Sequence, residues 1–113
     1  MPPSRNLLDR IPVRQRQHAE EPDGTVAILE ERFRWGWMRR FFPRAAARPI
    51  RIRLDEVGTF SWLAMDGVRS VGDLAGPLEE RFGDRVRPAA ERVARFVALL
   101  RRHGFIRFED DPR

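Results

Sequence analysis

Cysteine is absent from the 113-residue sequence, and so are lysine and tyrosine. Without cysteine the chain cannot form disulfides, thiolate zinc sites, iron–sulfur clusters or a cysteine nucleophile, and a reducing compartment suits it. No run of about 18 apolar residues occurs, and the N-terminus lacks an apolar stretch of signal-peptide length. We therefore expect a cytoplasmic protein without a membrane span.

Candidate catalytic groups are also scarce. The two histidines, His18 and His103, do not have the spacing of metal ligands, and the glycines form no phosphate-binding loop. The carboxylate pairs Glu79-Glu80 and Asp110-Asp111 are of the kind that solvated surfaces carry. The sequence therefore predicts a protein that is not an enzyme, with no metal site and no bound cofactor.

Positive charge is abundant. The 22 basic residues, all of them arginine, outnumber the 17 acidic residues and give a net charge of +5. This excess favours acidic partners, which include nucleic acid, an anionic membrane and an acidic peptide. A hydrophobic fraction of 42% with a mean hydropathy of −0.54 is typical of a globular domain with a strongly polar surface.

The N-terminal part of the chain is predicted to form a hairpin. Residues 1–10 mix proline, serine and charge, and we expect a flexible terminus there. The stretch "IPVRQRQHA" at 11–19 and the β-branched run "TVAILEE" at 25–31 flank the turn sequence "EPDG". Two extended segments around such a turn predict paired strands.

A third strand is predicted after an unusual linker. Residues 32–49 are rich in aromatic residues and arginine and fit no regular period, so we expect a linker within the domain. Apolar and arginine side chains then alternate with the period of a strand that has one apolar face, at Ile50, Arg51, Ile52, Arg53 and Leu54.

Three helices are predicted to follow, at residues 55–67, 70–82 and 88–104. The second begins with Ser70 and Asp73 in the spacing of a capping box. Pro77 lies inside this helix, where a proline removes a backbone donor, and we expect a kink or a late restart there.

The order of elements defines the expected fold. After the helices, "FIRFE" supplies a short extended segment, and residues 109–113 form an acidic tail. Three N-terminal strands, three helices and a short C-terminal extended segment predict an α+β fold that is similar to a winged helix-turn-helix. One domain is expected to span residues 11–108.

A winged helix could bind DNA through its last helix. That helix carries Arg92, Arg95, Arg101 and Arg102, which suit phosphates or guanine edges. Its outer face is otherwise filled by alanines and lacks the polar side chains that distinguish bases. DNA binding therefore stays an alternative function. The aromatic linker supports two further alternatives, a membrane-surface element and a platform for single-stranded nucleic acid, beside the simpler role of covering the core.

An ordered set of residues runs from the third strand to the C-terminal segment: Leu54, Asp55, Gly58, Trp62, Asp66, Gly67, Val71, Leu74, Phe82, Phe96, Leu99, Gly104, Phe105 and Ile106. In the string "IRLDEVGTFSWLAMDGVRSVGDLAGPLEERFG", continued by "ERVARFVALLRRHGFI", this set resembles the PqqD family, named for protein D of pyrroloquinoline quinone biosynthesis. The likeness covers about residues 50–108.

The resemblance implies a RiPP recognition element, a winged-helix-like domain of three strands packed on three helices. Such domains bind the leader of a ribosomally made precursor peptide and present it to a modifying enzyme, typically a radical S-adenosylmethionine enzyme. In the family the leader adds as a strand along the third strand and beside the third helix. Carried over, the peptide-binding residues are Ile50, Arg51, Ile52, Arg53, Leu54, Arg92, Arg95, Phe96 and Leu99.

The residues themselves are compatible with this role. Helical steps of about 100° place Arg92, Arg95 and Leu99 on one flank of the third helix, beside Phe96. An exposed strand edge offers unpaired backbone groups to an extended peptide, and arginines favour acidic side chains on that peptide. The expected partners are a leader peptide and a peptide-modifying enzyme; nucleic acid is disfavoured, and the same edge could pair two copies as a homodimer.

Overall fold

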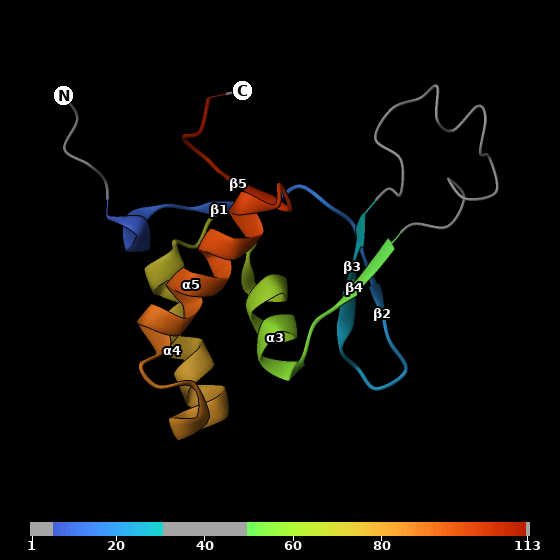
Figure 1. Cartoon of the computed structure of the whole chain (residues 1–113). Coiled ribbons are helices and arrows are strands. Elements are labelled where there is room, and N and C mark those ends of the chain that lie inside the picture. Colours follow the sequence, from blue (N-terminus) through green and yellow to red (C-terminus); the bar gives the residue numbers. More distant parts are fainter. Residues whose placement is uncertain (1–5, 31–49, 113) are drawn as a thin grey trace. The chain divides into compact units, whose positions relative to one another are not determined.

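The computed structural model describes residues 6–30 and 50–112. The chain forms two compact units, which we call the helical unit, Met1–Gln15 with Glu56–Arg113, and the strand unit, Arg16–Asp55 (Figure 1). The single domain expected at 11–108 remains a prediction. The predicted linker at 32–49 lies outside the described residues.

The helical unit contains three α-helices, two 3₁₀ helices and a two-stranded sheet. Strand β1 pairs antiparallel with β5, and α4 packs against both α3 and α5 (Figure 1). The elements are η1 (Leu7–Asp9), β1 (Pro12–Arg14), α3 (Glu56–Ala64), α4 (Val71–Phe82), η2 (Gly83–Val86), α5 (Ala89–Arg102) and β5 (Ile106–Phe108). Its core includes Trp62, Met65, Leu74, Leu78, Val93, Val97, Leu100 and Phe108.

Local signals in the sequence explain where α4 begins. The side chain of Ser70 accepts a hydrogen bond from the amide of Asp73 at 3.2 Å, and the carboxylate of Asp73 accepts one from the amide of Ser70 at 3.1 Å. The predicted capping box is therefore confirmed. Just before it, Asp66 accepts hydrogen bonds from the amides of Arg69 and Val68, which lower the pKa of its carboxyl group.

Helix α4 continues through Pro77, so the expected restart at this residue is wrong. The residue before a proline is normally disfavoured in helical conformation, because the proline ring meets its Cβ atom. That residue is Gly76, which has no Cβ atom. We infer that this glycine lets the helix pass the proline without a break.

The strand unit is one antiparallel sheet in the order β2-β3-β4. Its strands are β2 (His18–Glu20), β3 (Val26–Glu30) and β4 (Ile50–Arg53). The predicted hairpin is confirmed, since β2 and β3 pair across a turn in which Gly24 has a φ of 88°. In this turn Asp23 accepts hydrogen bonds from the hydroxyl and the amide of Thr25, which lower the pKa of Asp23.

The predicted α+β class is confirmed: residues 6–30 and 50–112 contain N-terminal strands, three α-helices and a short C-terminal strand. Three details differ from the expectations. The extended segment at 11–19 is two strands, since β1 belongs to the helical unit and β2 to the strand unit. Residues 6–10, expected to be flexible, contain η1, which packs against α4 and α5. The tail that starts at Glu109 folds back through its acidic side chains, as described below. Within the described ranges, none of the helices has the length and apolarity that a membrane span requires.

Candidate functional site

The outer edge of β4 is open in the part of the chain that the structure describes, because β4 pairs only with β3 there. The amide of Leu54 donates to the carbonyl of Val26 at 3.0 Å, which fixes the hydrogen-bonding phase of the ladder. In an antiparallel pair, bonded and non-bonded residue pairs alternate. Ile52, opposite Ile28, is therefore bonded to β3, whereas the backbone groups of Arg51 and Arg53 point to the open edge.

The hydrogen bonds between β3 and β2 support the same assignment of bonded and non-bonded residues in β4. Leu29 of β3 donates to the carbonyl of Gln17 at 2.8 Å, so Leu29 faces β2. Leu29 is also the register partner of Arg51 in β4. Because successive residues of a strand bond to opposite sides, Leu29 cannot also bond to Arg51. The open edge thus offers the backbone N–H and C=O groups of Arg51 and Arg53.

The side chains of β4 divide into an apolar and a basic face, as predicted. Ile50 is 41% exposed and Ile52 is half-buried, and both lie on one face. Arg51 and Arg53 are exposed on the other face. Arg51 forms an ion pair with Glu21 at 2.5 Å, whereas Arg53 forms no ion pair among the described residues.

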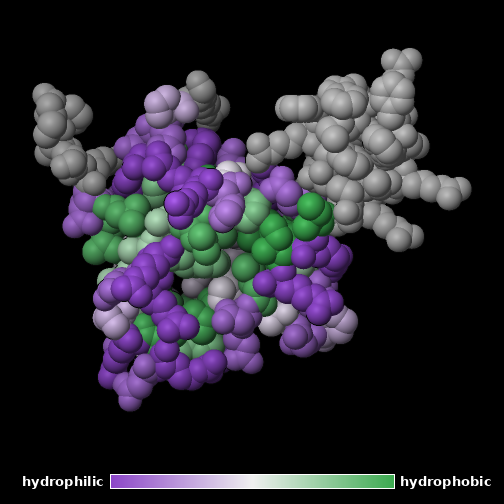
Figure 2. Space-filling view, in the orientation of Figure 1, coloured by the Kyte–Doolittle hydropathy of each residue, from purple (hydrophilic) through white to green (hydrophobic). Residues whose placement is uncertain are grey.

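The predicted residues of α5 form a stripe along that helix, at Arg92, Arg95, Phe96 and Leu99. We call it the α5 stripe. Their spacing of three and four residues places them on one side of the helix. Leu99 is 50% exposed and Phe96 is half-buried, and Figure 2 shows hydrophobic residues exposed between hydrophilic ones on the face that carries α5. This mixture suits a ligand with both apolar and acidic groups.

The two arginines of the α5 stripe have weak internal partners. Arg95 lies 2.6 Å from Glu91 in an ion pair whose two side chains are 79% and 56% exposed. Arg92 donates to the carbonyl of Arg85 at 3.3 Å. Exposed pairs of this kind contribute only about 0–1 kcal/mol, so a ligand carboxylate can replace Glu91 at little cost.

The predicted binding residues thus fall into two groups. Ile50 to Leu54 belong to the strand unit, and the α5 stripe belongs to the helical unit. Each group is assembled within its own unit as the sequence predicted. A groove formed jointly by the two groups remains a prediction.

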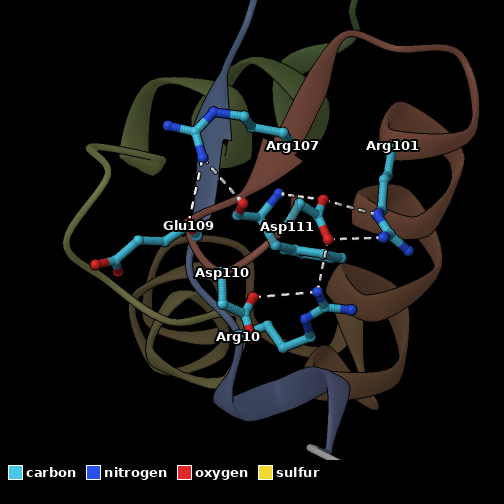
Figure 3. Close-up of polar contacts among 7 residues, drawn as sticks. Arg10, Arg101, Arg107, Glu109, Asp110 and Asp111 are labelled. Atoms are coloured by element: carbon cyan, nitrogen blue, oxygen red, sulfur yellow. Dashed lines mark hydrogen bonds and ion pairs between the residues drawn. The ribbon is translucent and has the colours of Figure 1, made fainter. Parts of the chain in front are cut away.

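A cluster of ion pairs that the sequence analysis missed holds the C-terminal turn (Figure 3). Asp111 lies 2.7 Å from Arg10 and 2.7 Å from Arg101, and it also accepts the amide of Phe108 at 2.9 Å. Burial alone would raise the pKa of Asp111, but the hydrogen bond from Phe108 and the charges of Arg101 and Arg10 outweigh it and lower the pKa. The sequence indicates a solvated pair at Asp110 and Asp111. It does not show that both carboxylates contact Arg10, which is far away in the sequence.

The same cluster encloses an aromatic ring. The guanidinium carbon of Arg10 lies 4.2 Å from the ring centroid of Phe108, and that of Arg101 lies 5.0 Å from it. Each contact has the geometry of a cation–π interaction. Phe108 is 1% exposed, so neither face of its ring is open to a ligand. We interpret the cluster as structural support for the end of α5.

The described ranges, 6–30 and 50–112, contain no candidate set of metal ligands. No group of three or more histidine, aspartate or glutamate side chains gathers there as metal ligands would. The carboxyl groups with a lowered pKa, Asp23, Asp66 and Asp111, are all held by hydrogen bonds of turns. These hydrogen bonds favour the charged form of each carboxyl group.

Comparison with known proteins gives one match. The family model described as coenzyme PQQ synthesis protein D (PqqD) matches residues 48–106, more than half of the chain. A search of curated proteins found no match, and neither did a search of solved structures. The matched span contains both groups of predicted binding residues, the β4 edge and the α5 stripe. The chain therefore belongs to the PqqD family.

Proposed function

We propose that this protein is a non-catalytic peptide-binding module. It binds the leader of a ribosomally made precursor peptide by strand addition and presents the peptide to a modifying enzyme, for which a radical S-adenosylmethionine enzyme is the leading candidate. Membership of the family supports the general role. The observation that carries the mechanism is the β4 edge, where Arg51 and Arg53 direct their backbone donors and acceptors outward.

The charges of β4 favour an acidic guest strand. In an added antiparallel strand, residues directly opposite each other lie on the same face of the sheet. Acidic side chains opposite Arg51 and Arg53 would form charge-assisted contacts, and apolar side chains would follow the face of Ile50 and Ile52. The guest would therefore alternate acidic and apolar residues over the length of β4.

The same charges disfavour pairing of β4 with a second copy of itself. An antiparallel pairing that keeps the two apolar faces together places an arginine opposite an arginine, for example Arg51 opposite Arg53. Like charges in such positions are destabilising. Self-pairing in the other registers would mix the apolar and basic faces. The edge thus selects against a homodimer and in favour of an acidic peptide.

Two substitutions of Arg53 distinguish what its backbone N–H contributes to peptide binding from what its side-chain charge contributes. Arg53→Pro removes the outward N–H without removing a hydrogen bond to β3, and prolines are tolerated at such edge positions. Arg53→Gln removes the charge and keeps the N–H. Ile52→Pro is the poorer test, because the N–H of Ile52 belongs to the ladder with β3.

The test starts with capture from native lysate, with and without nuclease, on immobilised wild-type, Arg53→Pro and Arg53→Gln proteins, with retained peptides identified by mass. A synthetic copy of a retained peptide is then titrated with each protein and followed by fluorescence anisotropy. We expect Arg53→Pro to weaken binding by about tenfold beyond Arg53→Gln, the loss of one backbone hydrogen bond of about 1.5 kcal/mol. Equal affinities of the two variants would contradict strand addition, and retention that nuclease abolishes would favour the DNA-binding alternative.

A further inference from the structure

A second surface of the helical unit carries a pocket. A pocket of about 640 Å³ lies at the C-terminal half of α5 and is also lined by residues of η1 and β5. Its apolar residues are Leu7, Ala98, Leu99 and Phe108. Every charged residue that lines it is an arginine, at positions 10, 95, 101 and 102. We call this site the arginine pocket.

The four arginines differ in how they are held. Arg10 and Arg101 both form ion pairs with Asp111 and both contact the ring of Phe108, so we regard them as the fixed part of the pocket wall. Arg95 is bound only by the exposed Glu91, and Arg102 forms no ion pair among the described residues. Arg95 and Arg102 are therefore the groups that can close on an incoming anion.

The apolar residues narrow the class of ligand. Leu99 is 50% exposed and Leu7 is half-buried, so an aliphatic side chain of a ligand gains contact area there. Nucleic-acid bases would need an open aromatic face to stack on. The ring of Phe108 is buried beneath two guanidinium groups and cannot serve.

We propose that the arginine pocket binds an acidic peptide segment in which a carboxylate side chain adjoins an aliphatic one. The carboxylate pairs with Arg95 and Arg102, and the aliphatic side chain packs on Leu7 and Leu99. The inference rests on the proposed function in one respect, because Arg95 and Leu99 also belong to the α5 stripe. Within that function, the ligand of this pocket is an acidic segment of the leader peptide.

The test uses a short probe of the stated chemistry, an acidic residue next to an aliphatic one. The ¹⁵N-labelled full chain is titrated with the tetrapeptide acetyl-Glu-Leu-Glu-Leu-amide, and amide chemical shifts are followed by NMR. The neutral control is acetyl-Gln-Leu-Gln-Leu-amide, and a short oligothymidylate represents nucleic acid. We expect the acidic probe to shift the amides of Leu7 and Ala98–Arg102, and the neutral probe and the oligonucleotide to leave them unchanged.

A matched pair of variants tests the charge. Arg102→Gln removes a pocket arginine from the last turn of α5, and Arg81→Gln removes an exposed arginine from the last turn of α4. We expect Arg102→Gln to weaken the acidic probe by about fivefold, the change that one exposed ion pair can supply, and Arg81→Gln to have no effect. Equal weakening by both variants, shifts confined to β4, or stronger binding of the oligonucleotide at the same amides would each overturn the proposal.

The two proposals can fail separately. Arg53→Pro is expected to leave the tetrapeptide shifts at Ala98–Arg102 intact, because the whole arginine pocket lies in the helical unit. Loss of those shifts in Arg53→Pro would refute an independent pocket. Conversely, equal binding of a captured peptide to Arg53→Pro and Arg53→Gln refutes strand addition and leaves the pocket proposal standing.

Discussion

Arg10 lies 2.7 Å from Asp111, so an ion pair joins the segment between η1 and β1 to the turn that follows β5. Arg101 approaches the same carboxylate at 2.7 Å from the last turn of α5. Arg10, from the other end of the chain, and Arg101, ten residues before Asp111, therefore share one acceptor, whose side chain is 12% exposed. Among the acidic residues of the helical unit, we therefore expect Asp111 to contribute most to stability.

Asp111→Asn is expected to lower the free energy of unfolding by about 1–3 kcal/mol, the usual effect of removing the charge from a group that accepts several part-buried or exposed hydrogen bonds. Urea unfolding at neutral pH measures this change. Asp110→Asn is the matched control, because Asp110 is more exposed and lies 3.1 Å from Arg10. If both variants lost the same stability, the central position of Asp111 would be disproved.

The pH dependence of this ion-pair cluster has a defined sign. The folded-state pKa of Asp111 is lowered from the ordinary value of 3.8, so its stabilising effect is complete above that value. The effect disappears as the pH falls through the folded-state pKa. Wild-type protein should therefore lose stability below about pH 4 more steeply than Asp111→Asn. Parallel pH profiles of the melting temperature would contradict this assignment.

Hydrogen exchange should alternate along β4. The amides of Ile52 and Leu54 bond to β3 and should exchange slowly, whereas those of Arg51 and Arg53 point outward and should exchange fast. Backbone amide exchange followed by NMR resolves the four positions. Binding of a captured peptide should slow Arg51 and Arg53 selectively. Uniform exchange rates along the strand would show that the ladder phase is different.

Ser70→Ala is expected to destabilise the protein by about 1 kcal/mol through loss of the cap of α4. The capping box also predicts that the stability effects of substituting Ser70 and Asp73 are coupled. The side chain of Ser70 accepts the amide of Asp73 at 3.2 Å, and the side chain of Asp73 accepts the amide of Ser70 at 3.1 Å. In a double-mutant cycle, Asp73→Ala should therefore cost less in the Ser70→Ala background than in wild type. Strictly additive losses would argue against the reciprocal cap.

Pro77→Ala should stabilise the protein by about 2 kcal/mol. The substitution restores the missing backbone donor of the α4 interior, worth about 3 kcal/mol, and gives up part of that gain because alanine makes the unfolded chain more flexible. Thermal and chemical unfolding measure the difference. Unchanged stability would mean that the helix already compensates for the missing hydrogen bond.

Local sequence signals predicted the elements well because their causes are local. The capping box at Ser70, the turn at Gly24 and the alternation at Ile50–Leu54 all depend on residues a few positions apart. The α5 stripe was predictable for the same reason, since helical spacing alone places Arg92 beside Arg95 and Leu99.

Features that depend on distant partners could not be predicted. Residues 11–19 have one continuous extended pattern in the sequence. The pairing of β1 with β5, in which Val13 lies opposite Arg107, assigns β1 to the helical unit. The outward groups of β4 follow from its register with β3, which no local spacing specifies. The arginine pocket was missed because Leu7 and Phe108 reach α5 only through the folded chain.

The pairing of β1 with β5 also constrains the order in which the chain can fold as it is made. Synthesis proceeds from the N-terminus, so β1 leaves the ribosome long before β5 exists. The hairpin of β2 and β3 has its partners at hand within a few residues and can form early. Until Ile106–Phe108 emerges, β1 lacks the strand that it pairs with in the helical unit. This unit can therefore be completed only after β5 has been made.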